Sequence, residues 1–208
     1  DEIKSELLKY DLKYELLAAD DLSIRVANLL HEKNIVGWFQ GRSEFGPRAL
    51  GNRSILASPL FDDMKKHLNL SIKKREGFRP FAPVVMEDKA KDWFLMEEPS
   101  KYMLATFKSD NKKTIPSCIH EDNTARVQTV SMDDNAKLYH LIEAFEKESN
   151  CPILINTSFN VRGEPIVNSP LDAIRCFFQT VMDVLVLGNY LILKSQNLNV
   201  SSVLLKPN

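Results

Sequence analysis

The stretch SPLDAIRCFFQTVMDVLVLGNYLIL, residues 169–193, predicts a helix followed by two strands. Ser169 stands where a helix cap belongs, Pro170 takes the first helical position, and Asp172 follows three residues after the cap. This combination is typical of a helix start. The apolar runs on either side of Gly188-Asn189 are typical of a β-hairpin. A helix beside strands favours an α/β fold.

The rest of the chain continues this alternation. The spacing of apolar residues predicts helices that begin at Asp20 or Asp21, lie between Phe61 and Ser71, and follow Asp133 and Asp134. Apolar, β-branched stretches predict strands at IVGWFQ (35–40), YMLATF (102–107), ARVQTV (125–130) and PILIN (152–156). We therefore expect an α/β domain in which helices flank a sheet.

Length and composition favour one globular domain. The 208 residues, 44% of them hydrophobic, are enough for a single substantial core. The first twenty residues are charge-rich and weakly periodic, so we interpret 1–20 as a linker or arm from a preceding domain and 21–208 as the folded domain.

The chain has no signal of a membrane or secreted protein. No apolar run approaches the ~20 residues that a membrane span needs, and the first residues are too charged for a secretory signal. Cys118, Cys151 and Cys176 match no disulfide framework or zinc pattern, and the four histidines have no metal spacing. We expect a cytoplasmic protein with reduced thiols and no metal site built by the protein.

Basic residues gather in two segments although the net charge is only −1. GRSEFGPRALGNRS (41–54) follows the strand predicted at 35–40 and carries Arg42, Arg48 and Arg53 among three glycines. Glycines allow close approach of the backbone to a phosphate, and guanidinium groups match phosphate oxygens with two hydrogen bonds. The alternative is a surface turn with solvated arginines.

The second segment, IKKREGFRPFAP (72–83), holds four basic residues around an apolar stretch, which indicates that part of it lies against the core. Charges beside a low-dielectric wall act strongly on a bound anion. A salt-bridge network, with Glu76 or Glu44, is the structural alternative. The basic residues are Lys73, Lys74, Arg75 and Arg79.

Two further segments carry polar residues beside predicted strands. Arg126 and Gln128 fall on the same face of the strand predicted at 125–130. Ser158 and Asn160 follow the strand predicted at 152–156, and the carboxyl end of a strand is a common place for a ligand site. A capped turn is the simpler interpretation of Ser158 and Asn160.

Four motifs together resemble the C-terminal domain of the O-carbamoyltransferases that act on nodulation factors and on antibiotics such as tobramycin and cephamycins. The motifs are GRSEFGPRALGNRSIL, LNLSIKKREGFRPFAP, HEDNTARVQTV and NTSFNVRGEPIV, in order from about Val36 to Gly188. The resemblance implies a YrdC-like fold, a twisted mixed sheet flanked by helices. One departure is Asn123, where the family has Gly. Asn tolerates the left-handed backbone, so we expect the turn to survive.

The resemblance also implies the site residues and the chemistry. It assigns catalysis and carbamoyl phosphate binding to Lys73, Arg79 and Arg126, and nucleotide phosphate contacts to Ser158 and Asn160. Arg48 is a further candidate for phosphate binding. Carbamoyl phosphate and ATP, with Mg²⁺ held through the nucleotide phosphates, would yield carbamoyl adenylate.

The implied partner is a separate Kae1-like N-terminal domain, which would pass the carbamoyl group to the hydroxyl of a sugar or antibiotic-like metabolite. The 208 residues leave no room for that domain, so we expect an excised half of a longer protein. Two alternatives stay open: a YrdC-like RNA-binding module and a threonylcarbamoyl-adenylate synthase. The near-neutral charge argues against nucleic acid as a partner.

Overall fold

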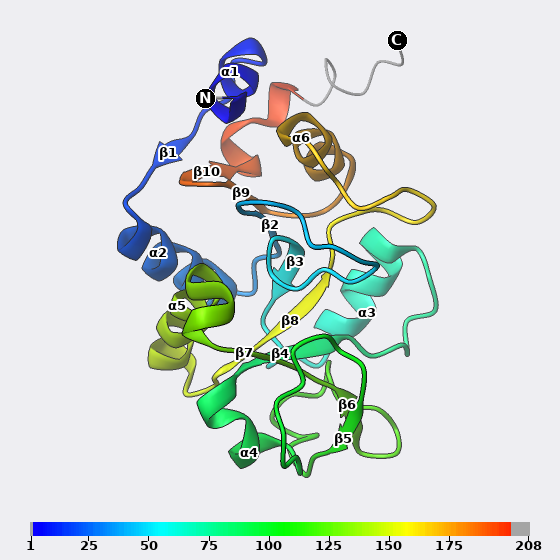
Figure 1. The fold of residues 1–208 in the computed structure, drawn as a ribbon. Coiled ribbons are helices and arrows are strands. Elements are labelled where there is room, and N and C mark those ends of the chain that lie inside the picture. The colour runs from blue at the N-terminus through cyan, green and yellow to red at the C-terminus, as the bar shows by residue number, and fades with distance from the viewer. Residues whose placement is uncertain (1, 201–208) are drawn as a thin grey trace.

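The computed structural model describes residues 2–200, and its centre is a mixed sheet of eight strands (Figure 1). The strand order is β1-β10-β9-β2-β3-β8-β4-β7. Two further strands, β5 and β6, form a separate antiparallel pair. The strands are β1 (Glu15–Leu16), β2 (Val36–Phe39), β3 (Arg53–Ala57), β4 (Ala82–Met86), β5 (Thr106–Lys108), β6 (Thr124–Arg126), β7 (Gln128–Val130), β8 (Ile153–Ser158), β9 (Val184–Leu187) and β10 (Tyr190–Leu193).

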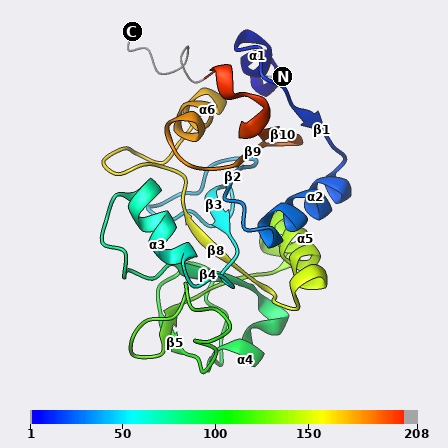
Figure 2. The same cartoon turned by 180° about the vertical axis from the view of Figure 1, so that it is seen from behind.

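Helices flank this sheet, so the predicted fold class is confirmed. α2 and α5 pack against each other on one side, and α3 and α6 lie on the other side in both views (Figures 1 and 2). No helix within residues 2–200 is both long and apolar enough to cross a membrane. The helices are α1 (Glu2–Lys9), α2 (Ala19–His31), α3 (Met64–Leu68), α4 (Ala90–Trp93), α5 (Met132–Ser149) and α6 (Pro170–Gln179), with a π turn at Asn69–Lys73 and 3₁₀ turns at Glu87–Lys89, Lys194–Gln196 and Leu198–Val200.

The strongest local signals of the sequence are confirmed. Ser169 caps α6, since its side chain accepts a hydrogen bond from the Asp172 amide and the Asp172 carboxylate reaches back to the cap. β9 and β10 form the hairpin about Gly188-Asn189. Asn123 has a φ of 60°, so the residue that departs from the family pattern adopts the left-handed turn as expected.

Two predicted helix starts were misplaced. α2 begins at Ala19 after Ala18, which has no side chain that can cap, and Asp20 and Asp21 lie inside the first turn. There their charges interact favourably with the helix dipole. The cap of α5 is Ser131, which forms a capping box with Asp134.

The prediction of one strand at 125–130 is wrong, because two short strands, β6 and β7, take its place. The chain leaves the β5–β6 pair after Arg126, passes the buried Val127, and joins the main sheet at Gln128, where β7 pairs with β4. The strand predicted at 102–107 is also much shorter, because only Thr106–Lys108 pairs.

Two central strands escaped the sequence analysis. β3 starts at Arg53 within the stretch that we interpreted as a loop. β4 contains Pro83, and proline argues against a central strand because it cannot donate a ladder hydrogen bond. Pro83 is tolerated here at a strand end, since the register of β4 with β7 begins only at Val84.

Part of the N-terminal segment packs into the folded domain, although the sequence analysis interpreted 1–20 as a linker or arm outside it. β1 pairs with β10 at the edge of the sheet, and α1 contacts α6. Leu7 is fully buried and Leu12 is 5% exposed, and both lie in the main hydrophobic core. Whether 1–20 also leads from a preceding domain stays a prediction.

A pair of neighbouring leucines tests this packing. Leu7→Ala removes a side chain that is fully buried, whereas Leu8→Ala changes one that is 63% exposed. We expect Leu7→Ala to lower the free energy of unfolding by about 2–5 kcal/mol. Leu8→Ala should change it by less than about 0.5 kcal/mol. Urea unfolding followed by circular dichroism measures both, and equal effects would show that the segment is not part of the core.

Candidate functional site

Five strands of the main sheet meet at one end of it. β2 and β8 end there, and β3, β4 and β7 begin there, because β3 is antiparallel to β2 and β8 and β4 is antiparallel to β8. The register places Ala82 opposite Asn156 and Ser54 opposite Ser158. Segments that are distant in the sequence therefore come together at this end of the sheet.

A cavity of about 360 Å³ lies at this end of the sheet. Four of the predicted site residues line it, namely Arg48, Arg79, Arg126 and Ser158. The other described residues of its wall are Pro47, Ala49, Arg75, Phe78, Pro80, Phe81, Ala82, Met103, Thr106, His120, Asn156 and Thr157. The lining among residues 2–200 thus contains four arginines and no Asp or Glu.

The positive charges of the arginines repel one another. Burial lowers the pKa of Arg126 from its usual value, and the positive charges of Arg48 and Arg79 lower it further. The pKa of Arg75 is lowered by burial and by the charges of Arg79 and Arg126. An anion in the cavity would relieve this repulsion, so the site is electrostatically prepared for one.

Lys73 lies behind the cavity wall. Its ammonium donates to the Ser158 carbonyl at 2.5 Å, the Asn160 side-chain oxygen at 2.9 Å, the Asn160 carbonyl at 3.1 Å and the Ser158 hydroxyl at 3.2 Å. Burial lowers the pKa of Lys73 to about 7. Lys73 therefore fixes the turn that carries Ser158, and these contacts bring three predicted residues together.

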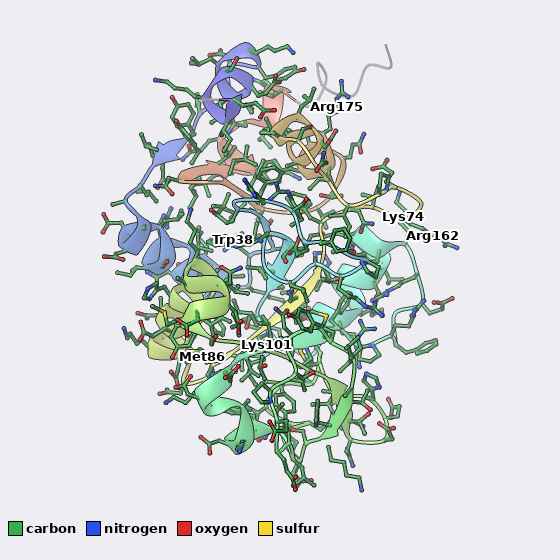
Figure 3. The ribbon with its side chains drawn as sticks, viewed as in Figure 1. Trp38, Lys74, Met86, Lys101, Arg162 and Arg175 are labelled. Carbon is green, nitrogen blue, oxygen red and sulfur yellow. The ribbon has the colours of Figure 1, made fainter. Side chains whose placement is uncertain are left out.

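Asn160 has a structural part in that turn, as the simpler interpretation held. Its side-chain nitrogen donates to the Glu164 carbonyl at 2.9 Å, and its side-chain oxygen accepts from the Ser158 hydroxyl at 2.8 Å. Arg162 ties the same turn to the end of the π segment by donating to the Lys74 carbonyl at 2.8 Å. Figure 3 shows Lys74 and Arg162 side by side at the edge of the molecule.

The three arginines of segment 41–54 differ in exposure and in role. Arg53 is 4% exposed, stacks on Phe39 and donates to the carbonyls of Gln40, Gly41 and Asn52. Arg42 is exposed. Arg48 is exposed at the cavity mouth and is the member of this loop that can meet a ligand.

Glu44 holds that loop in shape. Its carboxylate accepts from the amides of Leu50 at 2.7 Å, Asn52 at 2.8 Å and Arg53 at 3.3 Å. Gly51 follows with a φ of 114°, and a β-carbon there would stand 2.4 Å from the Leu138 side chain. The sharp path that presents Arg48 therefore depends on this glycine.

The salt-bridge alternative for the second basic segment holds only weakly. Arg79 lies 3.8 Å from Glu76, but both side chains are more than half exposed, and such pairs contribute little to stability. Arg75 donates to the Asn69 side chain at 2.6 Å and stacks on Phe81, which fixes its orientation. The segment is therefore positioned mainly by buried contacts and leaves Arg79 free to bind.

The wall residues that sequence reasoning did not single out include Arg75, His120 and Asn156. Arg75 was named in the basic segment, but the sequence around it does not distinguish it from the other basic residues as a wall residue. His120 was considered only as one of four histidines without metal spacing. Asn156 ended a predicted strand, and its place in the wall follows from the pairing of β8 with β4, which no local pattern reveals.

A larger cavity, of about 560 Å³, lies at the opposite ends of β4 and β7. Four carboxylates, those of Glu87, Asp88, Glu97 and Glu98, lie in its wall. Their charge opposes an anion, so the smaller cavity suits a phosphate better. No group of three or more His, Cys, Asp or Glu in residues 2–200 is arranged to hold a metal ion.

The fold and the cavity define an α/β domain with a pocket lined by four arginines. The family model described as carbamoyltransferase C-terminus matches residues 27–194. The chain therefore belongs to the carbamoyltransferase C-terminal family, and the resemblance that its motifs suggested is confirmed.

Similar proteins agree with this assignment. The chain is 43% identical to nodulation protein NolNO of Sinorhizobium fredii over 92% of its length and 29% of that protein. It is 40% identical to nodulation protein NolO of Bradyrhizobium diazoefficiens over 91% of its length and 35% of that protein. The chain thus spans about a third of the length of these relatives.

The fold also occurs in a solved structure. The crystal structure of full-length HypF in the phosphate- and nucleotide-bound form superposes with a TM-score of 0.60, at 22% identity. The match covers 82% of this chain and 25% of HypF. At this identity the likeness concerns the fold alone.

The buried Lys73 makes stability depend on pH. Because its pKa falls from 10.5 to about 7 on folding, the unfolded chain holds a proton between these values that the folded chain lacks. The contribution of Lys73 to the free energy of unfolding should therefore rise with pH from 7 to 9. We expect Lys73→Met to abolish this slope, measured by urea unfolding at several pH values.

Lys74→Met is the matched control, since Lys74 is the exposed neighbour of Lys73. Its pH profile should run parallel to that of the wild type. A Lys73→Met profile that also runs parallel would contradict the assigned burial of the ammonium.

Proposed function

We propose that this chain binds carbamoyl phosphate and ATP in the arginine-lined cavity and joins them to carbamoyl adenylate, as the activating domain of an O-carbamoyltransferase. The observation that supports the proposal most is the arrangement of Arg48, Arg75, Arg79 and Arg126 around one cavity without a carboxylate in its described wall. Family membership supports the carbamoyl chemistry.

The reaction needs charge neutralisation and positioning more than a strong base. Water first hydrolyses carbamoyl phosphate to carbamate, and inorganic phosphate leaves. An oxygen of the carbamate then attacks the α-phosphorus of ATP. A new P–O bond forms while the bond to pyrophosphate breaks, and pyrophosphate leaves. Guanidinium groups held near the phosphates stabilise the charge that builds up on their oxygens.

Each predicted residue has a role in this proposal. Arg79 and Arg126 bind the phosphate of carbamoyl phosphate, and Arg48 contacts phosphate from the mouth of the cavity. The Ser158 hydroxyl, which donates to the Asn160 side-chain oxygen in this structure, would turn to donate to nucleotide phosphates. Lys73 and Asn160 act through Ser158, because their side chains hold the turn in which it lies.

Mg²⁺ fits this site only as a companion of the nucleotide. The described wall offers no carboxylate, so phosphate oxygens and water would hold the ion. The ion would neutralise phosphate charge. The protein contributes the arginines that orient the same phosphates.

Transfer to the acceptor belongs to a different part of the protein in this proposal. The chain covers only about a third of its relatives, and a Kae1-like N-terminal domain would receive the adenylate. That domain would hand the carbamoyl group to a hydroxyl of a sugar or antibiotic-like metabolite. We propose that the reaction takes place in the cytoplasm.

Arginine variants test the binding site. Arg126→Ala should weaken carbamoyl phosphate binding by about 2 to 4 kcal/mol, because it removes a half-buried charged donor. Arg79→Ala should cost less, since water screens its side chain, which is 54% exposed. Arg175→Ala is the control, because Arg175 is exposed on α6, apart from the cavity wall (Figure 3). Isothermal titration calorimetry measures all three.

The same variants test the chemistry. Wild-type protein mixed with ATP, Mg²⁺ and carbamoyl phosphate should release pyrophosphate only when all are present. Arg126→Ala should lose this release, whereas Arg175→Ala should keep it. Unchanged carbamoyl phosphate binding in both Arg79→Ala and Arg126→Ala would refute the proposed site.

A further inference from the structure

Two residues in the wall of the arginine-lined cavity each carry a buried side-chain atom that has no hydrogen-bond partner among the described residues. One atom is the side-chain oxygen of Asn156, an acceptor, and the other is Nε of Arg126, a donor. Buried polar groups are nearly always paired, so an unmatched donor and acceptor in one wall require an explanation. The proposed function does not use the Asn156 side chain.

The orientation of the Asn156 amide is fixed by its neighbours. Its nitrogen donates to the Gln128 side-chain oxygen at 2.7 Å and to the Ala49 carbonyl at 3.1 Å. Gln128 in turn donates to the Leu50 carbonyl at 2.9 Å. A flipped amide would set oxygen against two acceptors, so the oxygen of Asn156 must remain the unpaired atom.

Little freedom exists for Asn156 to find another partner. The residue is 1% exposed and Gln128 is 3% exposed, so both amides are locked between the β2–β3 loop and the sheet. A buried acceptor that stays unpaired carries its full desolvation cost. A ligand that brings an N–H group to this point would recover that cost.

The carbamoyl group has the complementary pattern. Its NH₂ can donate to the Asn156 oxygen, and its carbonyl oxygen can accept from Nε of Arg126. Its phosphate meets the remaining donors of the arginines. Acetyl phosphate has nearly the same shape, but a methyl group replaces the NH₂ and cannot donate.

We infer that Asn156 is the residue that selects carbamoyl phosphate over acetyl phosphate, by accepting a hydrogen bond from the carbamoyl NH₂. This inference rests on the proposed function, because it assumes that the cavity takes an acyl phosphate. It adds the reason for the choice of acyl group. Sites that hydrogen-bond a substrate N–H reject analogues without it strongly, since a buried acceptor is then left unpaired.

The first test compares the two ligands on the wild-type chain by calorimetry. Carbamoyl phosphate should bind about 10- to 100-fold more tightly than acetyl phosphate, which corresponds to one unpaired buried acceptor. Equal binding of both ligands would overturn the inference and leave the proposed function standing. Binding of neither ligand would refute the proposed function and the inference together.

The second test uses variants and takes the ratio of the two affinities as its readout. Asn156→Ala should weaken carbamoyl phosphate by about 10- to 100-fold, leave acetyl phosphate nearly unchanged and bring the ratio close to one. Asn156→Thr retains an uncharged oxygen acceptor, and its hydroxyl proton can still be donated to the Ala49 carbonyl or the Gln128 side-chain oxygen, so it should keep a preference for carbamoyl phosphate. It also provides the measurement if Asn156→Ala does not fold.

Gln128→Leu separates recognition from simple positioning. This variant removes the partner of the Asn156 nitrogen but keeps the Asn156 oxygen, so any loss of affinity should affect both ligands equally. A preference that survives in Asn156→Ala, or one that disappears in Asn156→Thr, would overturn the role of the oxygen.

Discussion

Repulsion between guanidinium groups is the constraint on which the rest of the site depends. Arg126 is acted on by the charges of Arg48 and Arg79, and Arg75 by those of Arg79 and Arg126. Like charges gathered beside a partly buried wall raise the free energy of the fold, and water offsets this cost only in part. Such an arrangement requires surrounding contacts that fix the side chains, and a bound anion would offset the repulsion.

Three sets of polar contacts fix the segments that carry the arginines. Glu44 fixes the β2–β3 loop through backbone amides, and the Gln128–Asn156 pair fixes the same loop through backbone carbonyls. Lys73 fixes the turn after β8. These contacts lie outside the arginines themselves, so the protein separates the groups that bind from the groups that position. An orientation set in advance lowers the entropy that a ligand must lose on binding.

Features that depend only on neighbouring residues were predicted correctly from the sequence. The cap at Ser169 and the hairpin at Gly188-Asn189 depend on a few adjacent residues, and both are present. The clusters that hold Arg48 and Arg79 were also visible, because basic residues beside glycine or an apolar run are unusual for a plain surface. The motif resemblance then ordered these residues into one site.

The remainder depends on contacts between distant segments. The strand that would place Arg126 and Gln128 on one face is divided between two sheets, and only the pairing of β7 with β4 shows this. β4 could not be predicted because it contains Pro83. A proline is tolerated there only because the pairing of β4 with β7 begins after it, at Val84. Asn156 could not be recognised as part of the wall before Ala49, Gln128 and Asn156 were known to meet. Leu7 could not be assigned to the core from the sequence, because it lies in a charge-rich segment and its burial depends on tertiary packing.

A crystal structure with carbamoyl phosphate and a non-hydrolysable ATP analogue tests the central claim most directly. The account predicts phosphate groups within hydrogen-bond distance of Arg48, Arg79 and Arg126, in the cavity at the end of β8. Ligands bound away from these three side chains, with the cavity filled only by water, would contradict it.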